Sequence, residues 1–132
     1  EFGLCDLRTY AQFQDRVLGI KLEALSLLSQ LRRSGKRIAA FGAAAKGNTF
    51  LNYCGIKSDL IDFVVDSNPH KQGLYLPGSL IPILPPSALE QEQPDYLLIL
   101  PWNLTEEIEA AAGFIRGWGG QFMTCIPEVR VF

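Results

Sequence analysis

Apolar residues near the start of the chain recur every three or four positions, the spacing that aligns them along one face of an α-helix. This spacing predicts a single helix from Thr9 to about Ser34, in which Thr9 can cap the start and Gly35 can close the end. Such a helix would extend roughly 38 Å, more than one small domain requires. We therefore expect its first half to connect to a preceding domain and its second half to pack on a sheet. The apolar positions are Tyr10, Phe13, Val17, Leu18, Leu25, Leu28 and Leu31.

From residue 36 onward, short apolar runs alternate with helix-like segments. This alternation predicts an α/β fold with three layers, a Rossmann-like domain whose mostly parallel sheet has about five strands and helices on both faces. We expect residues 1–35 to form a leading helix packed on the domain and residues 36–132 to form the Rossmann-like part, in a single domain overall. Strands are expected at 36–41, 60–65, 81–83, 96–100 and 121–126, residues 129–132 could add an edge strand, and helices are expected at 48–54, 86–90 and 105–118.

Composition narrows the classes of protein to which the chain can belong. Of its 132 residues 48% are hydrophobic, which predicts a folded globular protein. Its 12 basic and 14 acidic residues give a net charge of −2, and this near-neutral balance argues against a nucleic-acid partner. No apolar stretch is long enough to cross a membrane, and the first residues lack the pattern of a signal peptide. We therefore expect a cytoplasmic protein.

The three cysteines and the single histidine are too dispersed to form a metal site. Cys5, Cys54 and Cys125 are far apart and lack the C-x-x-C spacing of zinc ligands, and His70 alone cannot complete such a set. We expect no metal on this chain, and we expect the cysteines to be reduced residues that serve packing.

Small residues in the segment 41–49 separate the first expected strand from the first short helix. Free backbone N–H groups at the start of such a helix can bind an anion, and Lys46 adds a positive charge there. The pattern Gly42-x-Ala44-x-x-Gly47 approximates the G-x-G-x-x-G of nucleotide-binding turns, with alanine in the second place. We expect a phosphorylated small molecule at this turn; the alternative is that the glycines only permit a tight turn and close packing. The candidate binding residues of the turn are Gly42, Ala44, Lys46, Gly47 and Asn48.

Further polar residues follow the other expected strands, at the edge where a parallel sheet binds its ligands. Asp66 ends the second strand and could accept hydrogen bonds from a ribose or start an Asx turn. In the long loop after it, Lys71 is a candidate binding charge, and His70 is a weak candidate for a catalytic base because no nucleophile or orienting partner is near it in sequence. Trp102 and Asn103 follow the fourth strand. They could stack on and hydrogen-bond a base or sugar, or they could cover the sheet end and cap the next helix.

Four ordered blocks of sequence, which lie between residues 41 and 108, resemble the C-terminal domain of S-adenosylmethionine-dependent sugar C-methyltransferases. Enzymes of that family methylate a carbon atom of a nucleotide-activated deoxysugar. The blocks are 41–49 with 52–56, then 65–78, then 81–83, and finally 94–96 with 101–108; their fixed letters read FGAAAKGNT, NYCGI, VDxNPxKQGxYLPG, IPI, PDY and PWNLxxEI.

The resemblance implies a three-part parent protein, with an N-terminal zinc-binding region, a central domain that binds the methyl donor, and this C-terminal piece. It implies that S-adenosylmethionine and the catalytic base belong to the upstream parts, so that no cofactor is expected on this chain and no methyl transfer is expected from it alone. It further implies that a Rossmann-like domain without donor binding helps hold the nucleotide sugar against the central domain. The residues of the Gly42–Asn48 turn then lead us to expect the diphosphate of that sugar there.

Two other functions stay open on the sequence alone. The chain contains no hydrolase, kinase or metalloprotease motif, so it offers a binding surface without a complete set of catalytic groups. It could instead be a non-enzymatic nucleotide- or CoA-binding module. It could also be a docking domain that binds no ligand, in which the chemistry of the turn is purely structural.

Overall fold

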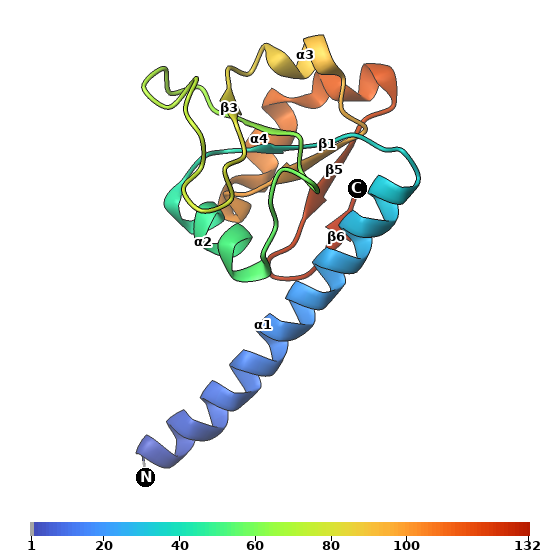
Figure 1. Ribbon diagram of the computed structural model, residues 1–132. Helices are drawn as coiled ribbons and strands as arrows, with labels where there is room; N and C mark the ends of the chain where they lie inside the picture. The colour runs from blue at the N-terminus through green and yellow to red at the C-terminus, as the bar shows by residue number, and fades with distance from the viewer. Residues whose placement is uncertain (1) are drawn as a thin grey trace.

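The computed structural model describes the backbone of residues 2–132 and the side chains of residues 11–132. A single sheet lies between two layers of helices (Figure 1). The helices are α1 (Phe2–Arg33), α2 (Ala45–Cys54), α3 (Ala88–Glu92) and α4 (Thr105–Ala111), with the 3₁₀ helices η1 (Trp102–Leu104) and η2 (Gly113–Trp118). The strands are β1 (Ile38–Phe41), β2 (Phe63–Val65), β3 (Ile83–Leu84), β4 (Tyr96–Ile99), β5 (Gln121–Thr124) and β6 (Arg130–Val131).

The strands form one sheet in the order β3-β2-β1-β4-β5-β6. β1 is central, because it pairs in parallel with β2 on one side and with β4 on the other. β3 and β5 extend the parallel sheet, and β6 closes one edge antiparallel to β5. The fold is thus mixed α/β with a mostly parallel sheet, as expected. The sheet has six strands rather than about five, because the last residues of the chain pair with β5.

Successive strand residues point to opposite faces of the sheet, and a different set of helices covers each face. In β1, Ile38 and Ala40 lie in the core formed with α1 and α2, whereas Ala39 lies in the core formed with α3, α4 and η2. The same alternation places Leu98 of β4 on the first face and Leu97 on the second. Burial on both faces explains why these strands read as continuous apolar runs.

Helix α1 begins at Phe2, because residues 4–8 contain no proline or glycine that would stop it. Thr9 therefore lies inside the helix and not at its start. The Thr9 side chain is outside the described residues. The end is as expected, because Gly35 adopts the left-handed conformation at φ 79° and closes the last turn. Arg32 donates to both carboxylate oxygens of Asp62, at 3.0 and 2.9 Å, and so fixes this end to the sheet. The other end projects away from the sheet (Figure 1). No helix in the described part of the chain, α1 included, is both long and apolar enough to span a membrane.

Several boundaries differ from the expected ones. Helix α2 begins at Ala45, before the expected Asn48, because alanine and lysine favour the helix and the turn before it is shorter than expected. The helix expected over 105–118 is interrupted after Ala111 and continues as a 3₁₀ helix from Gly113, since glycine is a weak helix former. The third strand begins two residues later than expected and ends one residue later, at the edge of the sheet, where the preceding proline is tolerated.

The cysteines that the structure describes have the packing role expected of them. Cys54 and Cys125 are buried free thiols in the core formed by α1, α2 and the sheet. Removal from water disfavours the thiolate, which raises the pKa of Cys54 to about 11 and that of Cys125 to about 12. Cys5 lies outside the described residues.

Candidate functional site

The carboxyl ends of β1 and β4 mark the point where the chain reverses its direction across the sheet. From β1 the chain proceeds to β2 and β3 on one side, and it then crosses to β4 on the other side of β1. Connections that leave two adjacent parallel strands in opposite directions open a crevice between them, and such sheets bind their ligands in this crevice. The turn from β1 to α2 and the turn from β4 to η1 form its two walls.

Close packing requires Gly42 in the turn between β1 and α2 and Gly47 in the first turn of α2. Gly42 adopts φ 97° and donates its N–H to the Val65 carbonyl at 2.9 Å. It approaches the second wall so closely that a Cβ atom would lie 2.7 Å from Cδ of Pro101. At Gly47, a Cβ atom would lie 2.7 Å from Cβ of Leu100. The glycines thus hold α2 against the sheet, which is the structural role expected as the alternative to ligand contact.

Helix α2 presents its N-terminus to the crevice. Its N-cap residue, Ala44, forms no side-chain cap, and the first turn of this fully described helix holds no acidic residue. The N–H groups of Ala45, Lys46 and Gly47 have no carbonyl partner within the helix. Asn48 is the first amide to bond back, to the carbonyl of Ala44 at 3.0 Å. Lys46 is exposed and pairs with no carboxylate of the described residues, and the carboxylate of Asp66, which lies beside the helix start, accepts from the N–H of Ala43 and not from these three amides.

Asp66 is held by the backbone of two turns. Its Oδ2 accepts a hydrogen bond from the N–H of Ala43 at 2.8 Å, and its Oδ1 accepts one from the N–H of Asn68 at 2.8 Å. The second bond forms an Asx turn, one of the two roles expected for this residue. The first bond joins the end of β2 to the turn after β1. The carboxylate therefore positions the turn, and a ligand hydroxyl could reach only its remaining lone pairs.

Two side chains from the loop after β2 brace the same turn. Nζ of Lys71 donates to the carbonyl of Ala43 at 2.9 Å, and Nε2 of Gln72 donates to the carbonyl of Asp66 at 2.8 Å. Lys71 is half-buried, and its ammonium group keeps two further N–H donors. Its charge lies close to the residue that precedes the N-cap of α2 and adds to the positive potential there.

Asn48 carries a buried polar atom that the protein leaves unpaired. Its side-chain oxygen Oδ1 has no hydrogen-bond partner among the described residues. One turn later on the same face of α2, Nδ2 of Asn52 donates to the carbonyl of Pro77 at 3.1 Å, so the loop 67–80 lies over this face. A buried amide oxygen without a partner costs about 1–3 kcal/mol, which a donor group of a ligand or a bound water would offset.

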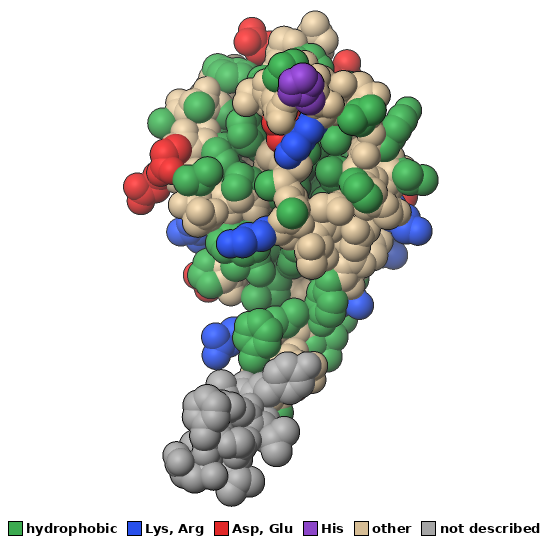
Figure 2. All heavy atoms as spheres, turned by 90° about the vertical axis from the view of Figure 1, so that its left-hand side faces the viewer, with side chains coloured by type: hydrophobic (Ala, Val, Ile, Leu, Met, Phe, Trp, Pro, Cys, Tyr) green, Lys and Arg blue, Asp and Glu red, His purple; other side chains and the backbone are tan. Residues whose placement is uncertain are grey.

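His70, the weak candidate for a catalytic base, is exposed on the loop after β2. Its backbone N–H donates to Oδ1 of Asn68 at 2.9 Å, whereas its imidazole ring has no bonding partner among the described residues. Figure 2 shows the histidine side chain at the surface, with a basic side chain below it. A catalytic base needs an orienting partner and a substrate within reach, and the catalytic role of His70 stays a prediction.

Trp102 and Asn103 line a cavity of about 310 Å³ that lies next to the second wall of the crevice. The carbonyl of Trp102 accepts a hydrogen bond from Oγ1 of Thr105 at 2.6 Å, which ties η1 to the start of α4. Asn103 does not cap α4, because Leu104 occupies the N-cap position and forms no side-chain cap. Asn103 is exposed and its amide is free to meet a ligand. The lining is completed by Thr105, Glu106, Glu107, Thr124, Ile126, Pro127 and Arg130.

One residue that the sequence did not single out, Ala43, completes the site. Its N–H donates to Asp66 and its carbonyl accepts from Lys71, while Gln72, one of the polar residues that follow the second expected strand, holds the backbone at the end of β2. Nothing in the residue type of Ala43 indicates this role, because only its backbone takes part. The position of Glu106 and Glu107 in the cavity could have been predicted from the sequence, since they occupy the first turn of the helix that directly follows Trp102. Among the described residues, no group of three or more His, Cys, Asp or Glu side chains could hold a metal ion.

Comparison with known proteins agrees with the four sequence blocks described above. The family of the C-methyltransferase C-terminal domain matches residues 1–127. The chain is also similar to the C-methyltransferase NovU of Streptomyces niveus, with 38% identity over 130 residues, which are 98% of this chain and 31% of that protein. It therefore spans about a third of the length of the curated relative that it matches. From the match over nearly its whole length, the chain belongs to the family of C-methyltransferase C-terminal domains.

Proposed function

We propose that this domain binds a nucleotide-activated sugar and holds it for methylation by a preceding domain of the same polypeptide. The observation that carries the proposal is the N-terminus of α2, where unpaired amides and Lys46 gather beside the crevice and no carboxylate of the described residues pairs with them. An anion is the ligand that such a helix end stabilises. In a nucleotide sugar, the diphosphate is the part that fits this requirement.

The diphosphate binds at the first turn of α2 in this proposal. The N–H groups of Ala45, Lys46 and Gly47 give directional hydrogen bonds, and the Lys46 ammonium gives a charge. Lys71 adds a second charge next to Ala43. The unpaired Oδ1 of Asn48 is an acceptor, so a sugar hydroxyl or a water molecule suits it and a phosphate oxygen does not.

The cavity beside Trp102 suits an uncharged part of the same ligand. The two carboxylates of Glu106 and Glu107 and the guanidinium of Arg130 line it. The carboxylates accept hydrogen bonds from hydroxyl or base N–H groups, and the net negative charge of the three groups disfavours a phosphate group. Trp102 offers an aromatic surface for stacking, and Asn103 both donates and accepts. The base or the sugar therefore occupies this cavity, while the diphosphate occupies the turn.

The strand order and the relatives support the rest of the proposal. The order β3-β2-β1-β4-β5-β6 is the order of Rossmann-like nucleotide-binding sheets. The relative from Streptomyces niveus is named a C-methyltransferase. We infer that the parent protein uses S-adenosylmethionine, bound by the preceding domain, and acts in the cytoplasm. Residues 1–35 then link that domain to residues 36–132, and this chain alone transfers no methyl group.

Calorimetric titration with dTDP and a dTDP-sugar tests the diphosphate site. Lys46→Ala should weaken binding roughly tenfold to a hundredfold, the effect of losing one charge-assisted hydrogen bond. Lys57→Ala is the matched control, because Lys57 is an exposed lysine before β2, at the opposite end of the sheet. An affinity unchanged by Lys46→Ala would exclude Lys46 from the phosphate site, and equal losses in both variants would indicate unspecific attraction.

The packing roles of Gly42 and Gly47 favour one alternative, a docking domain in which the turn binds nothing. Crystals soaked at high concentration of a dTDP-sugar separate the two functions, since a turn that stays empty supports the docking domain. A third function, a nucleotide- or CoA-binding module, is tested by thermal shift. A larger shift with NAD or CoA than with dTDP-sugars would favour that module.

A further inference from the structure

The apolar stripe of α1 continues beyond the part of the helix that the domain covers. Ile20, Ala24 and Leu28 follow one another at intervals of four and are buried against the sheet. Toward the N-terminus, Val17 and Phe13 continue the same face at intervals of three and four, yet Phe13 is 56% exposed. An apolar helix face normally packs against a core. The uncovered half of this stripe therefore lacks a partner within the described part of the chain.

A second row of apolar side chains stands beside the uncovered stripe. Leu18 is 46% exposed and Leu22, one turn later, is 57% exposed. Tyr53 of α2, which is 46% exposed, lies next to this row, with the ammonium of Lys21 5.1 Å from the centroid of its ring. Part of the row lines a groove of about 440 Å³ between α1 and α2. We define the stem surface as Phe13, Val17, Leu18, Leu22 and Tyr53.

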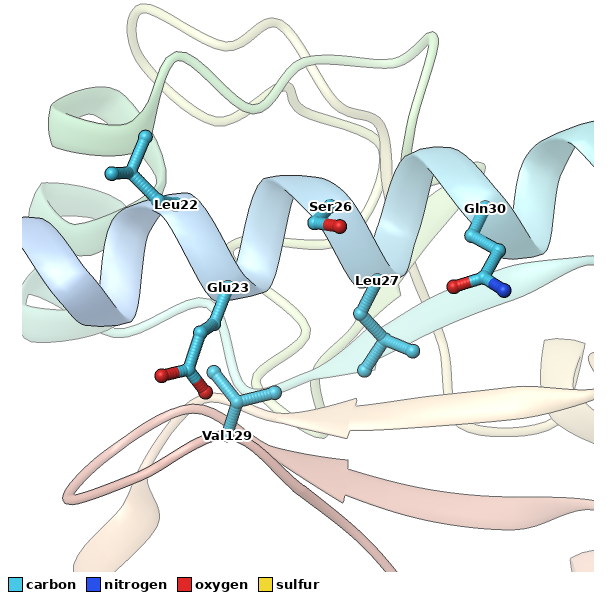
Figure 3. A pocket seen from close by; sticks show the side chains of 6 residues that line it. All are labelled: Leu22, Glu23, Ser26, Leu27, Gln30 and Val129. Atoms are coloured by element: carbon cyan, nitrogen blue, oxygen red, sulfur yellow. The ribbon is translucent and has the colours of Figure 1, made fainter.

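Another side of α1 faces the segment before β6. Glu23 and Leu27 point toward Val129 in that segment, whereas Leu22, which lines the same groove, points away from Val129 (Figure 3). Hydrophobic side chains are also visible along the stem that leaves the globular part in Figure 2. Four residues of the stem surface, Phe13, Val17, Leu18 and Tyr53, line one groove, and an exposed apolar patch of this kind marks an interaction site.

The position of the stem surface along α1 indicates which domain covers it. It lies on the half of α1 that projects away from the sheet (Figure 1). The chain belongs to a family of C-terminal domains and spans 31% of its relative, so in such proteins a larger part of the polypeptide precedes α1. A body attached at the start of α1 stays close to the stem surface at a high effective concentration, which favours this partner over a free one.

We infer that the stem surface is the docking face for the domain that precedes this one in the full-length methyltransferase. The inference rests on the proposed function only in requiring a preceding domain. Tyr53 is part of α2, and the N-terminus of the same helix carries the proposed diphosphate site. Docking at the stem surface therefore also sets the position of the bound ligand relative to the preceding domain.

Hydrogen–deuterium exchange of the full-length protein and of this 132-residue chain tests the docking face. In the shorter chain, the amides of residues 11–22 should exchange rapidly, because an unsupported helix end opens readily. In the full-length protein they should exchange about tenfold more slowly, and the double variant Phe13→Asp, Leu18→Asp should restore rapid exchange. Phe114→Asp is the matched control, since Phe114 is 43% exposed on η2, on the other face of the sheet. Equal exchange rates of residues 11–22 in the two wild-type proteins would overturn the inference.

Sedimentation of the 132-residue chain separates the preceding domain from a second copy of the chain. The wild-type chain should be monomeric. If it formed a dimer and the double variant were monomeric, the stem surface would serve self-association, and the inference would be overturned. Ligand titration keeps this test distinct from that of the proposed function. The double variant should bind dTDP as the wild type does, whereas Lys46→Ala should bind it weakly and leave the exchange of residues 11–22 unchanged.

Discussion

The carboxylate of Asp66 accepts a hydrogen bond from the backbone N–H of Ala43 at 2.8 Å and so locks the end of β2 to the turn after β1. Its other oxygen binds the N–H of Asn68. Asp66→Ala removes both acceptors and leaves the buried N–H of Ala43 unpaired. We expect the free energy of unfolding to fall by about 1.5–3 kcal/mol, the range for hydrogen bonds to a charged group, as measured by urea denaturation.

Asp59→Ala is the control for this variant. Asp59 is exposed in the segment before β2, and the described structure gives its carboxylate no bonding partner. Its replacement should change the free energy of unfolding by less than about 0.5 kcal/mol. If the two variants lost the same stability, the bond between Asp66 and Ala43 would not be what holds the turn.

Gly47 lies so close to Leu100 that even one additional carbon atom should disturb the packing of α2. A Cβ atom at Gly47 would lie 2.7 Å from Cβ of Leu100, and neither atom can move without moving its backbone. Gly47→Ala should therefore destabilise the chain by about 1–3 kcal/mol, although alanine is the better helix former. The midpoint of thermal unfolding measures this loss.

Gly113→Ala is the matched control for the packing at Gly47. Gly113 starts η2, has ordinary backbone angles, and offers open space to a Cβ atom. The same substitution there should be neutral or should stabilise the chain by about 0.4–1 kcal/mol, because it restricts the unfolded state. A stabilising effect of Gly47→Ala would contradict the packing argument.

Much of the fold was predictable because burial imposes a simple period on the sequence. The continuous apolar run of β4 indicates a strand covered on both faces, and the spacing of Leu25, Leu28 and Leu31 indicates a helix that packs on a sheet. Boundaries were less predictable, because they depend on weak local preferences. Thr9 is a good N-cap residue in general, but the backbone of α1 continues through it to Phe2.

The contacts within the candidate site were not predictable, because they join residues that are distant in sequence. The sequence indicates that Asp66 follows a strand, but not that its second oxygen binds the backbone 23 residues earlier. Nor does it indicate that Lys71 bonds to the carbonyl of Ala43, 28 residues earlier. Strand order decides which turns meet, and periodicity carries no information on strand order. Whether the residues gathered there contact a ligand stays a prediction.

Lys46 lies at the positive end of α2, so the free chain should tolerate its replacement by an acidic residue well. Lys46→Glu puts a negative charge beside the unpaired amides of the first turn, where it should stabilise the chain by about 0.3–1 kcal/mol at low salt. The same variant should bind dTDP far more weakly than the wild type does. Thermal melts and calorimetry of one preparation measure the two effects, whose signs should be opposite.

Lys57→Glu serves as the control for Lys46→Glu, because it makes the same change of charge away from the N-terminus of α2. It should leave dTDP binding unchanged and gain no stability from the helix end. A loss of stability in Lys46→Glu would mean that the helix end is already compensated, which would remove the main support for an anion site.

The buried thiols should make the chain less stable at alkaline pH. Burial raises the pKa of Cys54 from 9.0 to about 11, and the pKa of Cys125 from 9.0 to about 12. Between pH 9 and these values the unfolded chain loses its thiol protons while the folded chain keeps them, so the unfolded state binds fewer protons and stability falls as pH rises. Below about pH 8 both states keep their protons, and the thiols should contribute no pH dependence.

Comparison of variants isolates the thiols from the other groups that titrate in alkaline solution. In a Cys5→Ser background, Cys125→Ala removes the more strongly shifted thiol, and its melting temperature should fall less steeply between about pH 9 and 11 than that of the parent. A cavity left by the smaller side chain lowers stability at every pH and so does not change this slope. If the two slopes were equal, Cys125 would not keep its proton in the folded chain, and its burial in the core would be in doubt.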